Sequence, residues 1–218
     1  MDRVFFTSTA LTQPAGSFSF NDWELLLLGA TYAFTDNLQG TAVILPPIVK
    51  DMPFFGIGSL KARSQLDANI HIAAIGSIMH FSLDDDYENQ AWSVFSLGGM
   101  LTACLNDECS SILSGNVNVS FASETDDDSR LVTYAGSLVH KVSRRVKLMA
   151  ELASGTIFDR GESTDMPGFL FTYGLRFAGP EFAADVGFAR PVITDDDIDD
   201  DNPFVLGYPV LTFTYRAL

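Results

Sequence analysis

The fold is decided by one stretch of the chain, which reads Ser111-Ile112-Leu113-Ser114-Gly115-Asn116-Val117-Asn118-Val119-Ser120-Phe121. From Leu113 to Phe121, one set of alternate positions is apolar or glycine, and the other set carries serine and asparagine. Side chains that alternate with a period of two lie on opposite faces of a β-strand. An apolar outside and a polar inside is typical of a membrane barrel with a hydrated interior. A soluble β-sandwich gives the same alternation with its faces exchanged, so this stretch alone predicts a strand and leaves the class open.

The same alternation recurs along the whole chain and predicts about twelve strands. The predicted strands cover 2–10, 18–34, 38–46, 54–63, 69–82, 90–104, 110–122, 130–141, 145–157, 168–178, 181–192 and 204–217. Glycine and asparagine or aspartate punctuate them, as expected of turns. We therefore predict one all-β domain over residues 1–218, an antiparallel up-and-down transmembrane β-barrel.

The connections between these strands alternate in length and charge. Every second one, near 11–17, 46–53, 83–89, 123–129, 158–167 and 193–203, is long. Four of these carry the acidic tracts Asp84–Glu88, Glu124–Asp128, Asp159–Asp165 and Asp195–Asp201. In an up-and-down barrel they all lie on the same rim. Bacterial barrels have long extracellular loops and short periplasmic turns, which predicts an acidic outer rim and both chain ends in the periplasm.

Composition limits the partners and the location. The chain has 218 residues, 47% of them hydrophobic, and a formal net charge of -15. Such an acidic chain repels phosphate backbones, so we expect no nucleic-acid partner. No run approaches the roughly 20 apolar residues that a membrane-spanning helix needs. We expect a bacterial outer-membrane location; because the chain shows no signal peptide, we expect that its leader was removed.

Two short motifs carry a family resemblance. The segment Thr31-Tyr32-Ala33-Phe34-Thr35-Asp36-Asn37-Leu38 resembles the first periplasmic hairpin of many uncharacterised, porin-like bacterial outer-membrane barrels. Arg3-Val4-Phe5-Phe6 is similar to their first strand. The resemblance implies the fold and the location and no activity. The chain ends in Leu218 where those barrels carry a terminal aromatic residue, a place that Phe213 or Tyr215 would take.

Charged residues at the strand positions that we expect to face the barrel interior suggest a function for the lumen. The predicted lumen-lining residues are Lys61, Arg63, Lys147, Glu151, Arg176, Asp185 and Arg216. A barrel of about twelve strands lies between small, side-chain-filled barrels and open porins. One interpretation is a narrow pore for small polar or anionic solutes, which the basic residues attract. The other is a structural barrel whose lumen is plugged by paired charges, because buried charges must be paired.

The acidic tracts suggest partners at the cell surface. We expect contacts with outer-membrane lipid and lipopolysaccharide, and weak binding of divalent cations, which prefer oxygen ligands. The segment Asp195–Asp201 lacks the turn glycine and the final glutamate of a calcium loop, so the alternative is a solvated acidic surface. We expect a monomer.

His80 and Ser82 suggest a different class of function. Outer-membrane lipid hydrolases, phospholipases and lipid A deacylases, use a His-x-Ser pair that faces the outer leaflet, and these two residues have that spacing. A catalytic histidine needs an orienting partner, which Glu88 or Asn89 would supply. The competing interpretation is a polar pair at the lipid headgroups. A soluble β-barrel binding protein is a further alternative.

Two cysteines flank a predicted periplasmic turn. Cys104 and Cys109 enclose four residues, and the periplasm is oxidising. We predict a disulfide that clamps the hairpin, with free thiols as the alternative. His71 and His140 show no metal-ligand spacing, so we expect neither a metal nor a cofactor.

Overall fold

The computed structural model describes residues 3–23, 26–46, 52–84, 89–123, 129–159, 162–166, 168–193 and 206–217. The strands, in chain order, are β1 (Phe18–Trp23), β2 (Leu27–Thr35), β3 (Leu38–Leu45), β4 (Phe54–Asp67), β5 (Ile70–Asp84), β6 (Asn89–Cys104), β7 (Ser111–Ala122), β8 (Arg130–Lys141), β9 (Val146–Asp159), β10 (Glu162–Asp165), β11 (Gly168–Ala178), β12 (Phe182–Ile193) and β13 (Tyr208–Ala217). None of the described residues form a helix that is long and apolar enough to cross a membrane.

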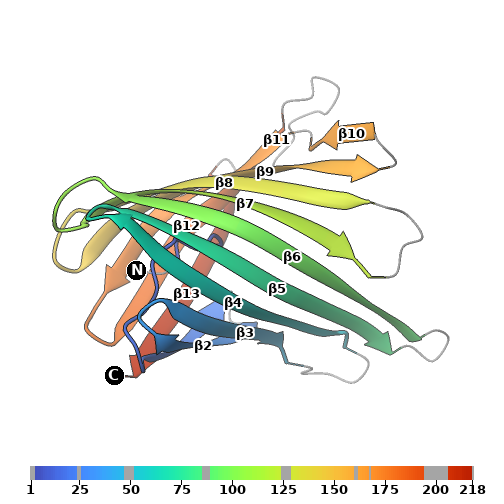
Figure 1. The fold of residues 1–218 in the computed structure, drawn as a ribbon, viewed down its shortest axis with the longest axis horizontal. Helices are drawn as coiled ribbons and strands as arrows, with labels where there is room; N and C mark the ends of the chain where they lie inside the picture. The colour runs from blue at the N-terminus through green and yellow to red at the C-terminus, as the bar shows by residue number, and fades with distance from the viewer. Residues whose placement is uncertain are drawn as a thin grey trace.

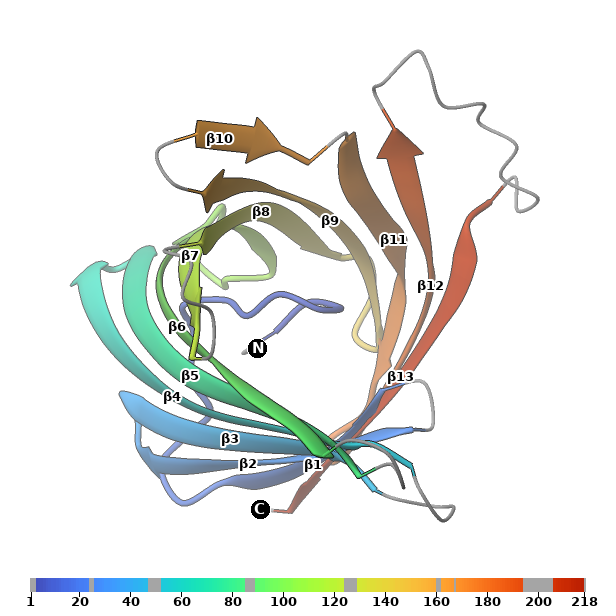
Figure 2. The same cartoon turned by 90° about the vertical axis from the view of Figure 1, so that its right-hand side faces the viewer.

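The strands form one antiparallel sheet that closes on itself (Figures 1 and 2). Neighbours along the chain pair with each other, and β13 pairs back with β1, which closes the ring. The short β10 pairs with Thr156–Asp159 at one end of β9, and β11 pairs with Val146–Ala153 further along the same edge. The ring therefore has twelve strand positions, which confirms the predicted barrel.

The first two predicted strands are wrong, although the total is right. Residues 3–17 form no barrel strand; the first part of this segment lies inside the ring (Figure 2), and residues 14–17 lie at its rim. The predicted strand 18–34 is two strands, β1 and β2, joined at residues 24–26. The expected outer connection 11–17 instead leads to β1 at the short-turn rim, where the Ala15 backbone N–H donates to the Asp36 carboxylate at 2.8 Å. The predicted strand 2–10 is absent and the predicted strand 18–34 is two strands, so the total number of strands in the ring is unchanged.

Most connections follow the predicted alternation of short and long, although the β1–β2 connection is also short. Short turns join β2 to β3, β4 to β5, β6 to β7, β8 to β9 and β11 to β12, and the barrel both begins and ends at this rim. Following the general rule for bacterial barrels, we call this the periplasmic rim and the other the outer rim. The acidic tracts belong to the outer connections, and 85–88, 124–128, 160–161 and 194–205 lie outside the described residues. Within the third tract, 162–165 form β10 rather than a loop.

The outside of the ring is apolar all the way round. Every strand position presents a large, exposed, outward-facing apolar or aromatic side chain, namely Phe20, Tyr32, Ile44, Leu60, Ile78, Leu97, Val117, Tyr134, Leu152, Phe171, Val186 and Tyr215. A soluble protein would not leave such a belt in water. In lipid, only helices and closed barrels satisfy every backbone polar group. The chain is a transmembrane β-barrel.

Leu97 tests this assignment. It is 67% exposed and lies near the middle of β6. We expect Leu97→Arg to lower the free energy of unfolding in lipid vesicles by about 2–4 kcal/mol, because a charge near the bilayer midplane loses its hydration.

Leu105→Arg is the matched control for this experiment. Leu105 is also exposed but lies in the β6–β7 turn at the periplasmic rim, where an arginine costs about 0–1 kcal/mol. Both losses are measured by urea titration, with the folded and unfolded fractions read from their mobilities on unheated gels. Equal losses for the two variants would argue against a bilayer around the middle of the barrel.

Candidate functional site in the barrel lumen

Residues 3–13, which we call the plug, occupy the periplasmic half of the lumen. Figure 2 shows this segment crossing the interior of the ring. Val4, Phe5, Thr9 and Ala10 have no exposed surface. Phe5 and Val4 are the largest of the completely buried side chains in the described chain.

Phe5 is seated against two glycines on neighbouring strands. Gly174 of β11 and Gly187 of β12 are paired across the sheet and face inward. A Cβ on Gly174 would clash with the Val186 carbonyl oxygen and lie 2.9 Å from the Phe5 Cζ atom. A Cβ on Gly187 would clash with the Tyr173 carbonyl oxygen and lie 2.7 Å from the Phe5 Cζ atom. Real Cβ contacts are longer, so both the neighbouring strand backbone and the Phe5 side chain require glycine at these positions. The two glycines thus form a niche that fits the plug.

Lys61 holds the middle of the plug from β4. Its Nζ donates to the Thr9 carbonyl oxygen at 3.0 Å and to the Leu11 carbonyl oxygen at 2.7 Å. The residue is only 2% exposed. A buried ammonium group is costly unless it is hydrogen-bonded, and here backbone oxygens of the plug satisfy it.

Glu151 holds the first turn of the plug from β9. Its Oε2 accepts from the Phe6 backbone N–H at 3.3 Å, from the Thr7 backbone N–H at 3.1 Å and from the Thr7 hydroxyl at 2.8 Å. Backbone groups that no strand partner satisfies would be expensive to bury. The Glu151 carboxylate satisfies two of these backbone N–H groups, which have no strand partner inside the lumen.

Arg176 and Asp185 form a buried ion pair beneath the plug. They are cross-strand neighbours on β11 and β12, with Nε–Oδ1 at 2.5 Å and Nη2–Oδ2 at 2.6 Å. The Thr212 hydroxyl donates to the same carboxylate at 2.7 Å. Arg176 also donates to the carbonyl oxygens of Arg3 and Val4, each at 3.2 Å. The pair therefore fixes both the sheet and the start of the plug.

The other three predicted lumen residues lie nearer the periplasmic rim. Arg63 of β4 approaches the Thr12 hydroxyl, with Nη1–Oγ1 at 3.5 Å. Lys147 is the cross-strand neighbour of Arg176 at the start of β9. Arg216, near the end of β13, is paired in register with Ser19. A role in attracting solutes stays a prediction for all three.

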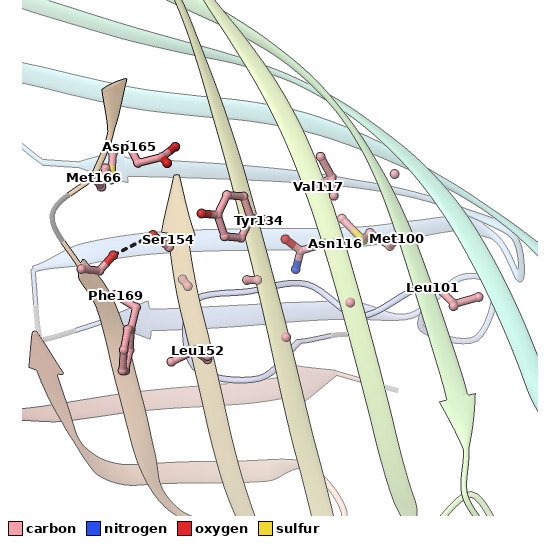
Figure 3. Close-up of a pocket in the computed structure, with 16 residues that line it drawn as sticks. Met100, Leu101, Asn116, Val117, Tyr134, Leu152, Ser154, Asp165, Met166 and Phe169 are labelled. Atoms are coloured by element: carbon pink, nitrogen blue, oxygen red, sulfur yellow. Dashed lines mark hydrogen bonds between the residues drawn. The ribbon is translucent and has the colours of Figure 1, made fainter. Parts of the chain in front are cut away.

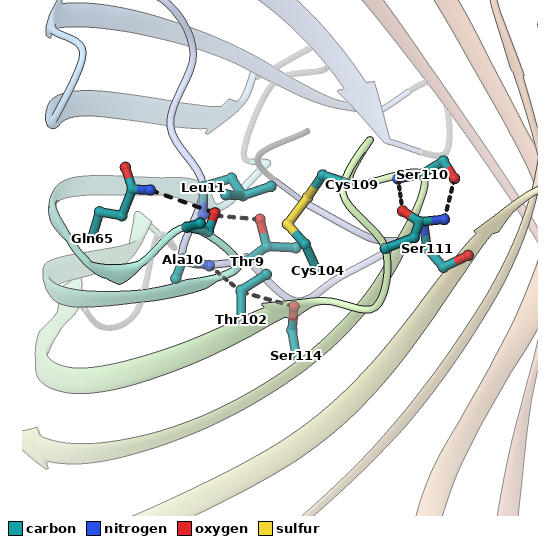
Figure 4. The surroundings of a disulfide bond; sticks show 12 residues. Thr9, Ala10, Leu11, Gln65, Thr102, Cys104, Cys109, Ser110, Ser111 and Ser114 are labelled. Atoms are coloured by element: carbon teal, nitrogen blue, oxygen red, sulfur yellow. Dashed lines mark hydrogen bonds between the residues drawn. A yellow bond between two sulfur atoms is a disulfide. The ribbon is translucent and has the colours of Figure 1, made fainter.

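A disulfide closes the β6–β7 turn beside the plug (Figure 4). It joins Cys104, the last residue of β6, to Cys109 in the turn. Cys109 packs against the apolar cluster that includes Leu11 of the plug. On the same strand, the Thr102 hydroxyl accepts from the Ala10 backbone N–H at 2.8 Å. The disulfide-closed end of the β6–β7 hairpin thus contacts the plug on one side.

The outer half of the lumen differs from the hydrated interior that the alternation suggests. Many inward positions there carry apolar side chains, namely Val43, Ile57, Met79, Val94, Leu131 and Ile157. Below them lie inward serines, of which Ser96 and Ser120 are hydrogen-bonded at 2.8 Å. The lumen therefore has a charged, plug-bearing periplasmic half and a largely apolar and neutral polar outer half.

The predicted His-x-Ser pair lies outside the barrel, on the lipid-facing side of β5. His80 and Ser82 share the outward face near the outer end of this strand. The hydrogen bond of His80 runs to the neighbouring strand, with Nδ1 at 2.9 Å from the Ser93 Oγ. Sequence spacing could not find this partner, because it depends on the β5–β6 register. Glu88 lies outside the described residues, and Asn89 is the first residue of β6.

A groove of about 970 Å³ follows the outer surface of β6 to β9 and the segment between β10 and β11 (Figure 3). Glycines at outward positions of three successive strands lower the surface there, namely Gly99, Gly115 and Gly136. At one end, the Ser154 hydroxyl donates to the Gly168 carbonyl oxygen at 2.7 Å. The groove contains none of the predicted lumen residues. Within the described residues, no group of three or more His, Cys, Asp or Glu side chains could hold a metal ion.

Comparison with known proteins gives structural likeness only. No protein-family model matches the chain, and no curated protein matches it. LpxR from Salmonella typhimurium aligns over 92% of this chain and 99% of that chain, with a TM-score of 0.47 and 10% identity. OmpT, an outer membrane protein of Vibrio cholerae, covers 92% and 95%, with a TM-score of 0.41 and 9% identity. The translocator domain of the autotransporter NalP from Neisseria meningitidis covers 92% and 84%, with a TM-score of 0.43 and 10% identity.

The Arg176–Asp185 pair supplies a test of the buried network. We expect Arg176→Met to lower the free energy of unfolding by about 3–5 kcal/mol, because it leaves the Asp185 carboxylate buried without its cation. The double change Arg176→Met with Asp185→Leu removes both charges and should recover most of that loss. Urea titration in lipid vesicles measures both variants. A double variant as unstable as the single one would show that the arginine acts through the plug carbonyls alone.

Proposed function

We propose that this outer-membrane protein is a barrel whose lumen is closed at rest by its own N-terminal segment. The observation that carries the proposal is the set of contacts from three strands to the plug backbone. Lys61, Glu151 and Arg176 each bond two or more backbone groups of the plug. These contacts favour a closed lumen over the narrow pore, with the N-terminal segment, rather than paired charges alone, as the element that closes it.

The charges in the lumen support closure for a second reason. A pore that attracts anions needs cations facing its water. Here the Lys61 ammonium group bonds plug carbonyl oxygens, and Arg176 bonds Asp185 and the plug. Releasing the plug would leave these groups without their partners, and unpaired buried charge is unfavourable. Two of the residues that would attract a solute, Lys61 and Arg176, therefore support closure of the lumen.

Conductance in planar lipid bilayers tests this proposal. We expect the full chain to give no current steps above the bare membrane. Deletion of residues 3–13 should give steady ion conductance, because it removes the segment that fills the periplasmic half of the lumen.

A milder variant covers the case in which the deletion does not fold. Lys61→Met with Glu151→Gln keeps the whole plug but weakens its anchors, and should give intermittent openings. Slower migration after boiling than before it shows that each variant is folded. Steady conductance of the full chain, equal to that of the deletion, would refute the plugged state.

A second candidate function rests on the hydrogen bond between His80 and Ser93. We infer that an ester of an outer-leaflet lipid is the substrate class that this outward-facing pair would take. Along a strand, residues two apart are separated by about 7 Å, so Ser82 also lies near the imidazole. The hydroxyl of one of these two serines would attack the ester carbonyl while His80 takes the hydroxyl proton and passes it to the leaving alcohol. Water would then hydrolyse the acyl-serine and release the fatty acid.

Release of labelled fatty acid from outer-membrane lipid tests this second function and separates the two serines. If Ser93 is the nucleophile, Ser93→Ala should abolish release and Ser82→Ala should leave it nearly unchanged. If Ser93 only orients the imidazole and Ser82 is the nucleophile, Ser82→Ala should abolish release and Ser93→Ala should reduce it by about 10²-fold or less, as for loss of acid–base help. Absence of release by the unmodified protein would end this hypothesis.

A further inference from the structure

Two adjoining cavities occupy the outer half of the lumen, above the plug. The one nearer the outer rim has a volume of about 480 Å³. Its walls include Ile57, Met79, Val94, Leu131 and Ile157, all half-buried or more exposed. Apolar side chains on the inner face of a membrane barrel are unusual, because barrel interiors are generally polar. Because these apolar side chains face the lumen, contact with membrane lipid does not explain them.

The deeper cavity has a different chemistry. It has a volume of about 330 Å³ and is floored by Phe6, Thr7 and Ser8 of the plug. Its walls carry hydroxyl and amide groups, namely Ser77, Ser96, Asn116, Asn118, Ser120 and Thr133. The three serines line both cavities, so the two spaces adjoin at a ring of hydroxyl groups. Each volume falls in the range of about 300–1,000 Å³ that is usual for small-molecule sites.

Charge is nearly absent from these walls. Among the described residues that line the two cavities, Arg130 at the outer end is the single charged one, and its guanidinium group lies 5.7 Å from the Phe121 ring centre. Neutral donors and acceptors below, with aliphatic side chains above, match a molecule that has an uncharged polar head and a hydrocarbon tail. A charged head would lose its hydration here without a counter-ion.

We propose that the outer half of the lumen is a binding site for a single-chain amphiphile with an uncharged, hydroxyl-bearing head. The head lies against the serine ring and the plug floor, and the tail lies along Met79, Val94 and Leu131. The proposal goes beyond closure of the lumen, because it assigns a ligand to the part that the plug leaves unfilled. Its failure would leave the plugged state untouched, since conductance and ligand binding are measured separately.

Trp92 provides a reporter for this site. It is the inward neighbour of Val94 on β6 and stacks on Phe81 of β5, with ring centres 5.1 Å apart. The chain has two tryptophans, and the other, Trp23, lies under the Arg3 guanidinium group at 4.6 Å from its ring centre. Trp23→Phe therefore leaves one indole beside the proposed tail.

The test is quenching of Trp92 fluorescence by a monoacylglycerol with a bromine at the end of a medium-length chain. The Trp23→Phe protein is held in lipid nanodiscs and titrated with this probe. We expect quenching that saturates. Ala122→Phe, which adds bulk to an inward position in the apolar wall, should weaken the apparent affinity about tenfold or more, because the cavity is overfilled.

Ala91→Phe is the matched control, since it adds the same bulk to the lipid-facing side of β6, and it should leave the affinity unchanged. Met79→Glu, which places a charge in the wall, is a second variant should Ala122→Phe fail to fold. A brominated alkyl sulfate should bind much more weakly than the monoacylglycerol. Quenching that rises linearly, or that is equal in Ala122→Phe and Ala91→Phe, or equal binding of the sulfate, would overturn the proposal.

Discussion

Everything in this structure depends on the pairing of β13 with β1. In the hydrocarbon core of a bilayer there is no water to satisfy a free strand edge, so a sheet is stable there only when its last strand bonds its first. The six register pairs from Phe18–Ala217 to Trp23–Thr212 supply that closure. Once the sheet is a ring, its outer face meets lipid and its inner face encloses a space that the chain must fill, hydrate or leave for a ligand. The plug and the two cavities divide that space between them.

The lumen thus contains two environments separated by a short distance. In the periplasmic half, charged side chains bond backbone groups of the plug, so polar groups without strand partners are satisfied. In the outer half, aliphatic side chains face one another across a ring of serine hydroxyl groups. A chain that is strongly acidic overall therefore keeps its described lumen nearly free of unpaired negative charge. The proposed closure and the proposed ligand site use these two halves independently.

Local alternation was enough to predict the barrel and the face of the sheet on which most strand side chains lie. Segments such as Ser111–Phe121 reveal their two faces within a few residues, and parity alone placed His80 outward. What it could not predict is the partner of any such side chain. Val4 and Phe5 are consecutive apolar residues that read as the start of a strand, yet the Val4 carbonyl oxygen bonds Arg176, 172 residues away. Likewise, the bond from His80 to Ser93 follows from strand register, which the pattern of either strand leaves undetermined.

The position at which the plug joins the sheet sets the direction in which it can leave the lumen. Residues 12–17 run under the β2–β3 turn, where the Gly16 backbone N–H donates to the Ala33 carbonyl oxygen at 2.8 Å. This attachment lies at the periplasmic mouth, and the ring closes around the plug without including it in the ladder. A pull exerted from the periplasm can therefore draw the segment out by breaking side-chain contacts, with the strand ladder left whole. A pull from the cell surface would instead have to drag it through the outer half. The plug is in this sense a separable element, held in the ring by side-chain contacts and by its attachment at one mouth.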